Sequence, residues 1–315
     1  MKKKLSDNVY AEISCFDNGS EVTEYHVMLH VSDGLLNFRD QLTAIDQAYT
    51  CLLRDHLQGA KTVFKRYFLS DAYNQANDVV SVELDYADYA LSIIQQPPLD
   101  GTKVAVWAYL QTHVQTRALH SGLHEVTHGS YRHLWNASAH NLAKNSEYQT
   151  RLLLNEYIMQ LMQEGCKLSD NCIRTWFFVN DVDNNYPGVV KARNTVFFTQ
   201  NLTDETHFIA STGIGGFSQT RSESVAIDFA GKSKKTEVIE ITNAGHSTLN
   251  ISSLQMFTPG LRISLGKRQL APGETTKLKI TAMRDDLQKV RTQPRILMIT
   301  NDPQKPKVTI TINAK

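Results

Sequence analysis

Six histidines gather in the middle of the sequence, and two of them have the spacing of a zinc site. They are His113, His120, His124, His128, His133 and His140. The segment His124-Glu-Val-Thr-His128 has the form H-E-x-x-H, in which two histidines one helical turn apart bind zinc and the glutamate activates water. Its context is poor, because Gly129-Ser130 follows at once and Tyr131 stands where the extended motif needs glycine. A zinc metalloprotease is the least favoured alternative, and a solvated linker explains the same residues.

His133 and Trp135 form a second candidate pair. The segment from Tyr131 to Trp135 alternates as a strand does, which puts His133 and Trp135 on one face. An imidazole exchanges protons near neutral pH, and an indole can line a ligand pocket. His133 is therefore the candidate catalytic acid or base and Trp135 a candidate substrate-binding residue. Packing in the core is the alternative for Trp135.

Arg174 is a candidate anchor for a carboxylate. It shares a strand face with Trp176, whereas the matching position in the first half of the chain is the apolar Phe64. The planar guanidinium can donate two parallel hydrogen bonds to a carboxylate, which a lysine cannot do. A structural ion pair with Asp181 or Asp183 is the alternative.

The run Ser211-Thr212-Gly213 offers hydrogen-bond donors where a backbone can approach a ligand closely. A hydroxyl from Thr212 and a backbone N–H near Gly213 could stabilise a developing oxyanion. An ordinary transition from strand to loop explains the same residues.

The elements that position these residues follow from hydrophobic periodicity. Apolar residues every three or four positions predict one helix between Leu35 and Leu52 and another carrying Leu154, Ile158 and Leu161. Runs rich in β-branched and aromatic residues predict the strands. These are Thr62–Leu69, Val79–Leu84, Leu91–Ile94, Val104–Tyr109, Tyr131–Ala137 and Ile173–Val179.

The order of these elements repeats once. Phe68–Asp71 aligns with Phe178–Asp181, and Gln41 precedes the first segment as Gln149 precedes the second. There is no Gly-rich phosphate loop, so the pattern predicts an α+β unit with helices on one face of each sheet.

The sequence changes character after Gly231-Lys-Ser-Lys-Lys235. Short alternating runs replace helical periodicity, and turn residues separate them. The runs are Glu237–Thr242, Leu249–Leu254, Leu261–Leu265, Thr276–Ala282, Ile296–Thr300 and Val308–Ile312. Their spacing predicts an all-β immunoglobulin-like sandwich over 233–315.

Composition limits the partners. A formal charge of +1 creates no field that would attract nucleic acid or an anionic membrane. No apolar run reaches the ~20 residues of a membrane helix, and no apolar leader follows the basic start. We therefore expect a cytoplasmic protein, with a secreted or periplasmic location open if a leader was removed. The residues give no reason to expect a cofactor or a metal.

Three segments in the last part of the chain resemble immunoglobulin-like repeats of the ASH/HYDIN type. They are Ile241–Gly245, Leu270–Glu274 and Ile299–Pro303. The resemblance implies a docking or spacer module without catalytic residues.

The duplicated part resembles the YjgF/Rid superfamily, which includes proteins labelled endoribonuclease L-PSP, and its tandem chorismatase-like branch most of all. The resemblance rests on Cys172–Asp181, Tyr186 with Ala192-Arg-Asn194, and Ile209–Gly215. It implies a chorismate-mutase-like fold assembled as a trimer with ligand clefts between units. Simple members hydrolyse enamines and imines, and the chorismatase branch hydrolyses the enolpyruvyl ether of chorismate. The resemblance also marks Arg193 as the family's helix arginine.

The sequence departs from the simple members at two positions. Phe208 and Ile209 stand where the substrate-gripping arginine is expected. Ile227 stands where the deaminases carry glutamate, with Asp228 one residue away. Both departures weigh against ordinary imine deamination, so a Rid-type deaminase and a chorismatase-like hydrolase both stay open, and the near-neutral charge gives no support to a ribonuclease.

Together these observations predict three domains: repeats at 1–120 and 121–232, and the sandwich at 233–315. We expect binding, with hydrolysis as a further step, of a small carboxylate-bearing metabolite at a cleft between the repeats. Arg174, Arg193, Trp135, Thr212 and Gly213 would bind it, with His133 as acid or base. A homotrimer or pseudo-oligomer within one chain would form the cleft, and the sandwich could dock a protein partner. The alternative is a non-catalytic scaffold.

Overall fold

The computed structural model describes residues 1–17, 19, 21–83, 88–128, 131–220, 222–234, 236–258, 261–282 and 293–312. They divide into two compact units. The described residues of Met1–His128 and His133–Ser233 form the first, here called the tandem unit. Those of Gly129–Arg132 and Lys234–Lys315 form the second, the sandwich unit. No helix in the described ranges is long and apolar enough to span a membrane.

The first half of the tandem unit is a six-stranded sheet with two helices. Its strands are β1 (Lys2–Lys4), β2 (Val9–Phe16), β3 (Glu24–Val31), β4 (Ala60–Leu69), β5 (Ala90–Gln95) and β6 (Val104–Thr112), in the order β1-β2-β3-β6-β4-β5. The helices are α1 (Phe38–Asp55) and α2 (Ala72–Val82). Both helices contribute to one core with the sheet, through side chains such as Leu42 and Val79.

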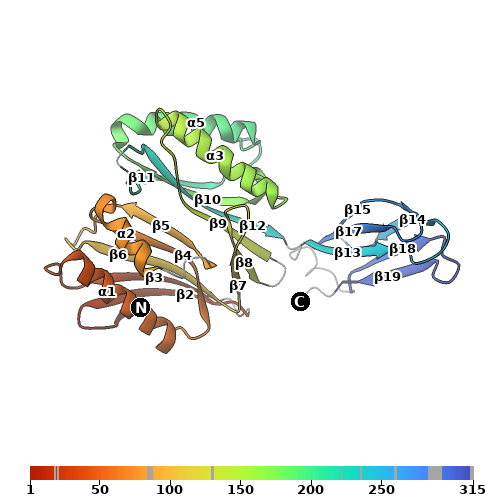
Figure 1. Ribbon diagram of the computed structural model, residues 1–315, viewed down its shortest axis with the longest axis horizontal. Helices are drawn as coiled ribbons and strands as arrows, with labels where there is room; N and C mark the ends of the chain where they lie inside the picture. The colour runs from red at the N-terminus through yellow and green to blue at the C-terminus, as the bar shows by residue number, and fades with distance from the viewer. Residues whose placement is uncertain are drawn as a thin grey trace. The chain divides into compact units, whose positions relative to one another are not determined.

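The second half repeats this plan. Its strands are β7 (Gln115–Ala118), β8 (His124–His128), β9 (Tyr131–His140), β10 (Cys172–Val179), β11 (Ala210–Gly215) and β12 (Val225–Lys234), in the order β11-β10-β12-β9-β8-β7. The helices are α3 (Ser146–Gln163), the short α4 (Leu168–Asn171) and α5 (Val182–Thr199). Figure 1 shows α3 and α5 lying side by side over the second sheet.

Strand pairing shows that the two halves are the same arrangement. In each sheet one neighbouring pair is parallel, β4 with β5 and β10 with β11. Two buried glutamines also match. Gln41 donates to Leu36 O and accepts from Lys103 N, while Gln149 donates to Ala143 O and accepts from Ser224 N. In each half the glutamine therefore ties the start of the long helix to the start of the last strand. The predicted boundary after residue 120 stays a prediction, and the pairing places β7 in the second sheet.

One predicted strand is wrong. Val79–Val82 is the end of α2, and Leu84 lies outside the described residues. The side chain of Asp71 caps the helix by accepting from Asn74 N. Ala72, Ala76 and Val79 are buried at helical spacing. The helical burial pattern thus decides the structure over the β propensity of Val79 and Val80.

The interpretation of His124–His128 as a helical zinc motif is also wrong, as is the linker alternative. These residues form strand β8. Four residues along a strand span about 13 Å, so the two histidines cannot share a metal as they would on a helix. No group of three or more metal-binding side chains occurs among the described residues.

The sandwich unit contains two sheets. One has the order β13-β17-β15, and the other β16-β14-β18-β19. The strands are β13 (Thr236–Thr242), β14 (Leu249–Met256), β15 (Leu261–Leu265), β16 (Gln269–Leu270), β17 (Thr275–Ala282), β18 (Arg295–Thr300) and β19 (Lys307–Thr311). Its core contains Leu261, Leu278, Ile280 and Ile296. All six predicted runs coincide with strands to within two residues at each end.

Candidate functional site

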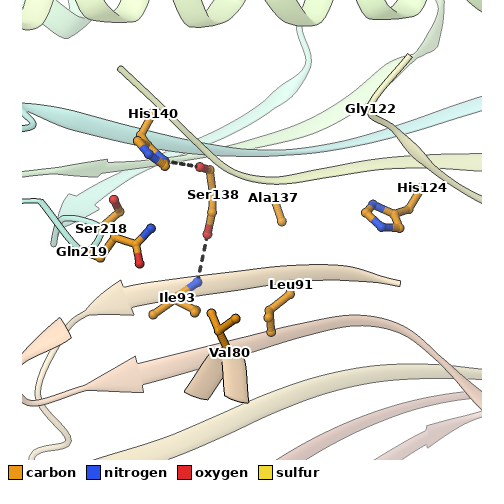
Figure 2. A pocket seen from close by; sticks show the side chains of 10 residues that line it. All are labelled: Val80, Leu91, Ile93, Gly122, His124, Ala137, Ser138, His140, Ser218 and Gln219. Carbon is orange, nitrogen blue, oxygen red and sulfur yellow. Dashed lines mark hydrogen bonds between the residues drawn. The ribbon is translucent and has the colours of Figure 1, made fainter. Parts of the chain in front are cut away.

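A cavity of about 250 Å³ lies between the two halves of the tandem unit. The first half contributes an apolar wall, and the second contributes most of the polar groups, as Figure 2 shows. The lining residues are Val80, Leu91, Ile93, Gly122, His124, Ala137, Ser138, His140, Ser218 and Gln219. An apolar cavity with a few convergent polar groups is the usual form of a small-molecule site.

Ser138 joins the two halves at this cavity. Its backbone is left-handed, with φ of 53°, although it lies within strand β9. Its Oγ accepts from Ile93 N at 3.0 Å, and its N donates to Asp228 Oδ1 at 2.6 Å. Its carbonyl lies 2.7 Å from Nδ1 of His140 (Figure 2). A non-glycine residue in this conformation is uncommon, and these contacts hold Ser138 in place.

Behind Ser138 lies a buried ion pair that connects the two sheets. Arg66 of β4 donates to Asp228 Oδ2 of β12 through Nη2 at 2.6 Å and through Nε at 3.1 Å. Ser92 donates to the same oxygen at 2.6 Å. Burial lowers the pKa of Arg66, and the Asp228 carboxylate opposes that shift.

Four aromatic rings surround this arginine. The Arg66 guanidinium carbon lies 4.8–5.2 Å from the ring centroids of Phe64, Trp107, Trp176 and Phe178. Such contacts add to the stabilisation of a desolvated cation. Asp228 lies one residue from the position where the deaminases carry glutamate. In this chain it is part of an ion pair between the two sheets.

A second buried carboxylate, Glu223, lies behind the polar end of the cavity. Ser218 Oγ donates a short hydrogen bond to Glu223 Oε2. Glu223 is 1% exposed, and its Oε1 accepts no hydrogen bond from the described residues. His140 Nε2 lies 3.7 Å from that oxygen. This carboxylate has no arginine or lysine partner within the described ranges, in contrast to Asp228.

The structure brings two of the predicted site residues together. Arg174 on β10 donates through Nη2 to Thr212 Oγ1 on the neighbouring strand β11, at 2.9 Å. Its guanidinium carbon lies 4.9 Å from the Trp176 ring centroid, and its Nε is buried without a described hydrogen-bond partner. In the described part of the chain no ion pair joins Arg174 to Asp181 or Asp183. Arg174 thus has unused donor capacity, as an anchor for a carboxylate needs.

His133 and Trp135 lie on β9 as predicted, but neither lines the cavity. Burial lowers the pKa of His133 to about 4, helped by His128 and Lys232. The His133 and His128 Nε2 atoms lie 3.4 Å apart. Trp135 is 6% exposed and packs with Phe64 in the apolar layer between the sheets. That is the core packing weighed as its alternative.

Arg193 and Gly213 lie elsewhere in the second half. Arg193 is on α5, where its guanidinium donates to the adjacent Asn194. Gly213 is on β11, and a Cβ there would lie 2.8 Å from Cε2 of Tyr186. The glycine thus allows Tyr186 to pack against the strand. These six site assignments remain predictions.

Sequence reasoning missed Ser138 and Ser218, which line the cavity, and Glu223 behind it. No spacing marks them, because Ser138 on β9 and the segment before β12 come together only when these two strands lie side by side in the second sheet. His140 was one of the clustered histidines, and the clustering was the one available signal.

The comparison with family models gives a match in the last part of the chain. A family model for the HYDIN/CFA65/VesB-like Ig-like domain matches residues 226–315. That match is consistent with the predicted immunoglobulin-like sandwich. The chain matches none of the curated proteins.

Several solved structures are similar to parts of the chain. A chorismatase is 12% identical, with 60% of this chain and 50% of that chain covered and a TM-score of 0.38. A member of the YjgF/YER057c/UK114 family from Mycobacterium tuberculosis is 18% identical, with coverages of 35% and 84% and a TM-score of 0.27. A Porphyromonas gingivalis protein of unknown function is 28% identical, with a TM-score of 0.23; the similarity covers 24% of this chain and 36% of that one.

Proposed function

We propose that the tandem unit binds a small polar metabolite in the cavity between its two halves. The observation that carries the proposal is the composition of the cavity wall. Both halves form it, and Ser138, His140, Ser218 and Gln219 supply polar groups at one side of an apolar pocket. A cavity without a ligand would not need several polar side chains at one side, because buried polar groups are costly unless they are paired.

A more specific proposal concerns the ligand's chemistry. Arg174 and Thr212 do not line the cavity. We propose them as a separate anchor for a carboxylate, because the Arg174 Nε is buried and has no described partner. The pKa of His133, lowered to about 4, keeps that ring neutral at pH 7, so it could only accept a proton. Hydrolysis of a chorismate-like or enamine substrate would be the reaction of such a site, and we propose it as a step beyond binding.

Thermal unfolding with a panel of small carboxylates, amines and neutral compounds tests the proposal. A ligand that binds only the folded chain raises the melting temperature. We expect at least one compound to do so, and this is an acid such as chorismate or pyruvate if Arg174 anchors the ligand. Ser218→Ala should remove the shift of any ligand that the cavity holds. Arg174→Ala should remove it if that arginine holds the carboxylate.

Two controls make the result interpretable. Arg39→Ala removes an exposed arginine paired with Asp78 and should leave any shift intact. If no acid, amine or neutral compound changes the melting temperature of the unmodified chain, that result would contradict metabolite binding and would favour a scaffold.

A further inference from the structure

The hydrogen bonds around Ser218 determine what this residue can offer a ligand. Ser218 lines the cavity, and its hydroxyl donates to Glu223 Oε2. A serine hydroxyl has a single proton, so the remaining lone pairs of Ser218 Oγ can only accept. Ser138 differs, because its Oγ accepts from Ile93 N and keeps its own proton available.

His140 lies at the same end, between Ser138 and Glu223. Its Nδ1 lies 2.7 Å from the carbonyl oxygen of Ser138, and a carbonyl cannot donate, so Nδ1 carries a proton. The other ring nitrogen, Nε2, lies 3.7 Å from Glu223 Oε1, which is beyond hydrogen-bond distance.

Glu223 differs from Asp228 in its partners. Asp228 on the neighbouring side is paired with Arg66, but within the described residues Glu223 has only Ser218 and His140. A buried carboxylate without a compensating cation is costly. A cation placed in the cavity against Ser218 would lower that cost.

The next step rests on the proposal that the cavity is a ligand site. For that site, the geometry points to a small primary amine as the ligand. A primary ammonium has three N–H donors. Ser218 Oγ and the side-chain oxygen of Gln219 can accept from two of them, and Figure 2 shows both residues at the same end of the cavity. The ammonium charge balances Glu223.

The rest of the ligand is a short hydrocarbon. Val80, Leu91, Ile93 and Ala137 give the remaining wall its apolar character (Figure 2). A volume of about 250 Å³ suits a branched alkyl or single-ring group and excludes a nucleotide.

Calorimetric titration of the full chain with matched compounds tests the inference. The probes are isoamylamine, isoamyl alcohol and 4-methylpentanoate, which share one alkyl group and differ in charge. We expect isoamylamine to bind at least tenfold more tightly than the alcohol. Ser218→Ala and Glu223→Gln should each remove most of that preference, whereas Ser169→Ala, a serine of α4, should not change it.

The outcomes separate this inference from the proposed function. Equal affinity for amine and alcohol would overturn it, as would an amine preference that both Ser218→Ala and Glu223→Gln preserve. Binding of the carboxylate alone, with sensitivity to Ser218→Ala, would keep the cavity as a ligand site and overturn the amine. No binding by any probe or by the metabolite panel would overturn both. If Glu223→Gln fails to fold, Ser218→Ala still decides.

Discussion

Two buried carboxylates of the tandem unit differ in what surrounds them. Asp228 accepts from Arg66, Ser92 and the Ser138 backbone, so its charge is fully compensated. Glu223 accepts from Ser218 and leaves one oxygen unused. A fully paired buried carboxylate serves the fold, whereas one with an unpaired oxygen behind a cavity favours a ligand that balances its charge. We therefore assign the first to folding and the second to binding.

The inter-sheet ion pair predicts a large effect of one substitution. Arg66→Met leaves Asp228 as an unpaired buried charge, so we expect the free energy of unfolding to fall by about 3–5 kcal/mol. Urea denaturation measures it. The control is Arg39→Ala, which breaks an exposed pair with Asp78 and should cost less than about 1 kcal/mol. Similar costs for both variants would contradict the structural role of the buried pair.

His133 predicts a pH dependence. The pKa of this residue is about 4 in the folded chain and near 6.5 when unfolded. Between these values the unfolded chain binds a proton that folded His133 does not, so stability falls as the pH drops from about 6.5 to 4. The stability that the chain gains by keeping His133 neutral is fully present above pH 6.5.

Urea denaturation at pH 5 and pH 7.5 measures this difference. His133→Gln should lose less stability on acidification than the unmodified chain. His207→Gln, at an exposed histidine, should keep the original difference. An unchanged pH response in His133→Gln would mean that other groups cause the acid sensitivity.

At the scale of elements, the repeated plan is maintained by equivalent details. The β4–β6 pairing shifts register between Thr62 and Phe64, and the β10–β12 pairing shifts between Cys172 and Arg174. A bulge at the same place in both sheets bends both strands alike. The halves therefore differ in the side chains they present and not in their backbone plan.

The packing of α5 on α3 gives a prediction at this scale. A Cβ on Gly188 would lie 3.0 Å from the backbone N of Glu147 and would also meet the Ser146 side chain. Alanine normally stabilises a helix by about 1 kcal/mol over glycine. Here we expect Gly188→Ala to lower stability, because α5 must move away from α3.

Chemical denaturation of Gly188→Ala shows whether the substitution raises or lowers the free energy of unfolding. The control is Thr195→Ala, an exposed position on the same helix, for which we expect little change. A stabilised Gly188→Ala variant would show that the two helices separate without cost.

At the scale of the whole molecule, the chain consists of two units with separate cores. The sandwich core includes Leu278, which is fully buried, and the core of the second sheet includes Leu154, also fully buried. Separate cores allow separate unfolding.

We expect two calorimetric transitions. Leu278→Ala should destabilise the sandwich unit by about 2–5 kcal/mol and shift one transition alone, because it leaves a cavity in that core. Leu154→Ala should shift the other transition. A single transition that moves with both variants would show that the units unfold together.

The sequence alone determined part of the elements and missed others, among them β2, β3 and α5. Periods of 3.6 and 2 residues are local, so they predicted a helix between Leu35 and Leu52, where α1 spans Phe38–Asp55, and all six sandwich runs without knowledge of the fold. The duplicated order of elements was equally readable, because repetition is a property of the chain. The error at α2 arose where β-branched valines occupy a helix that Asp71 caps.

Only the tertiary structure decided the cavity and the charges behind it. Arg66 and Asp228 are 162 positions apart, and Ile93 and Ser138 are 45 apart. No periodic signal links such residues, because the packing of one sheet on the other brings them together. The sequence named Arg174 and Thr212 from their types, but their hydrogen bond depends on the parallel pairing of β10 and β11. Local sequence patterns determine where helices and strands form. The packing of the two sheets determines which polar groups are buried and which of those remain without a hydrogen-bond partner.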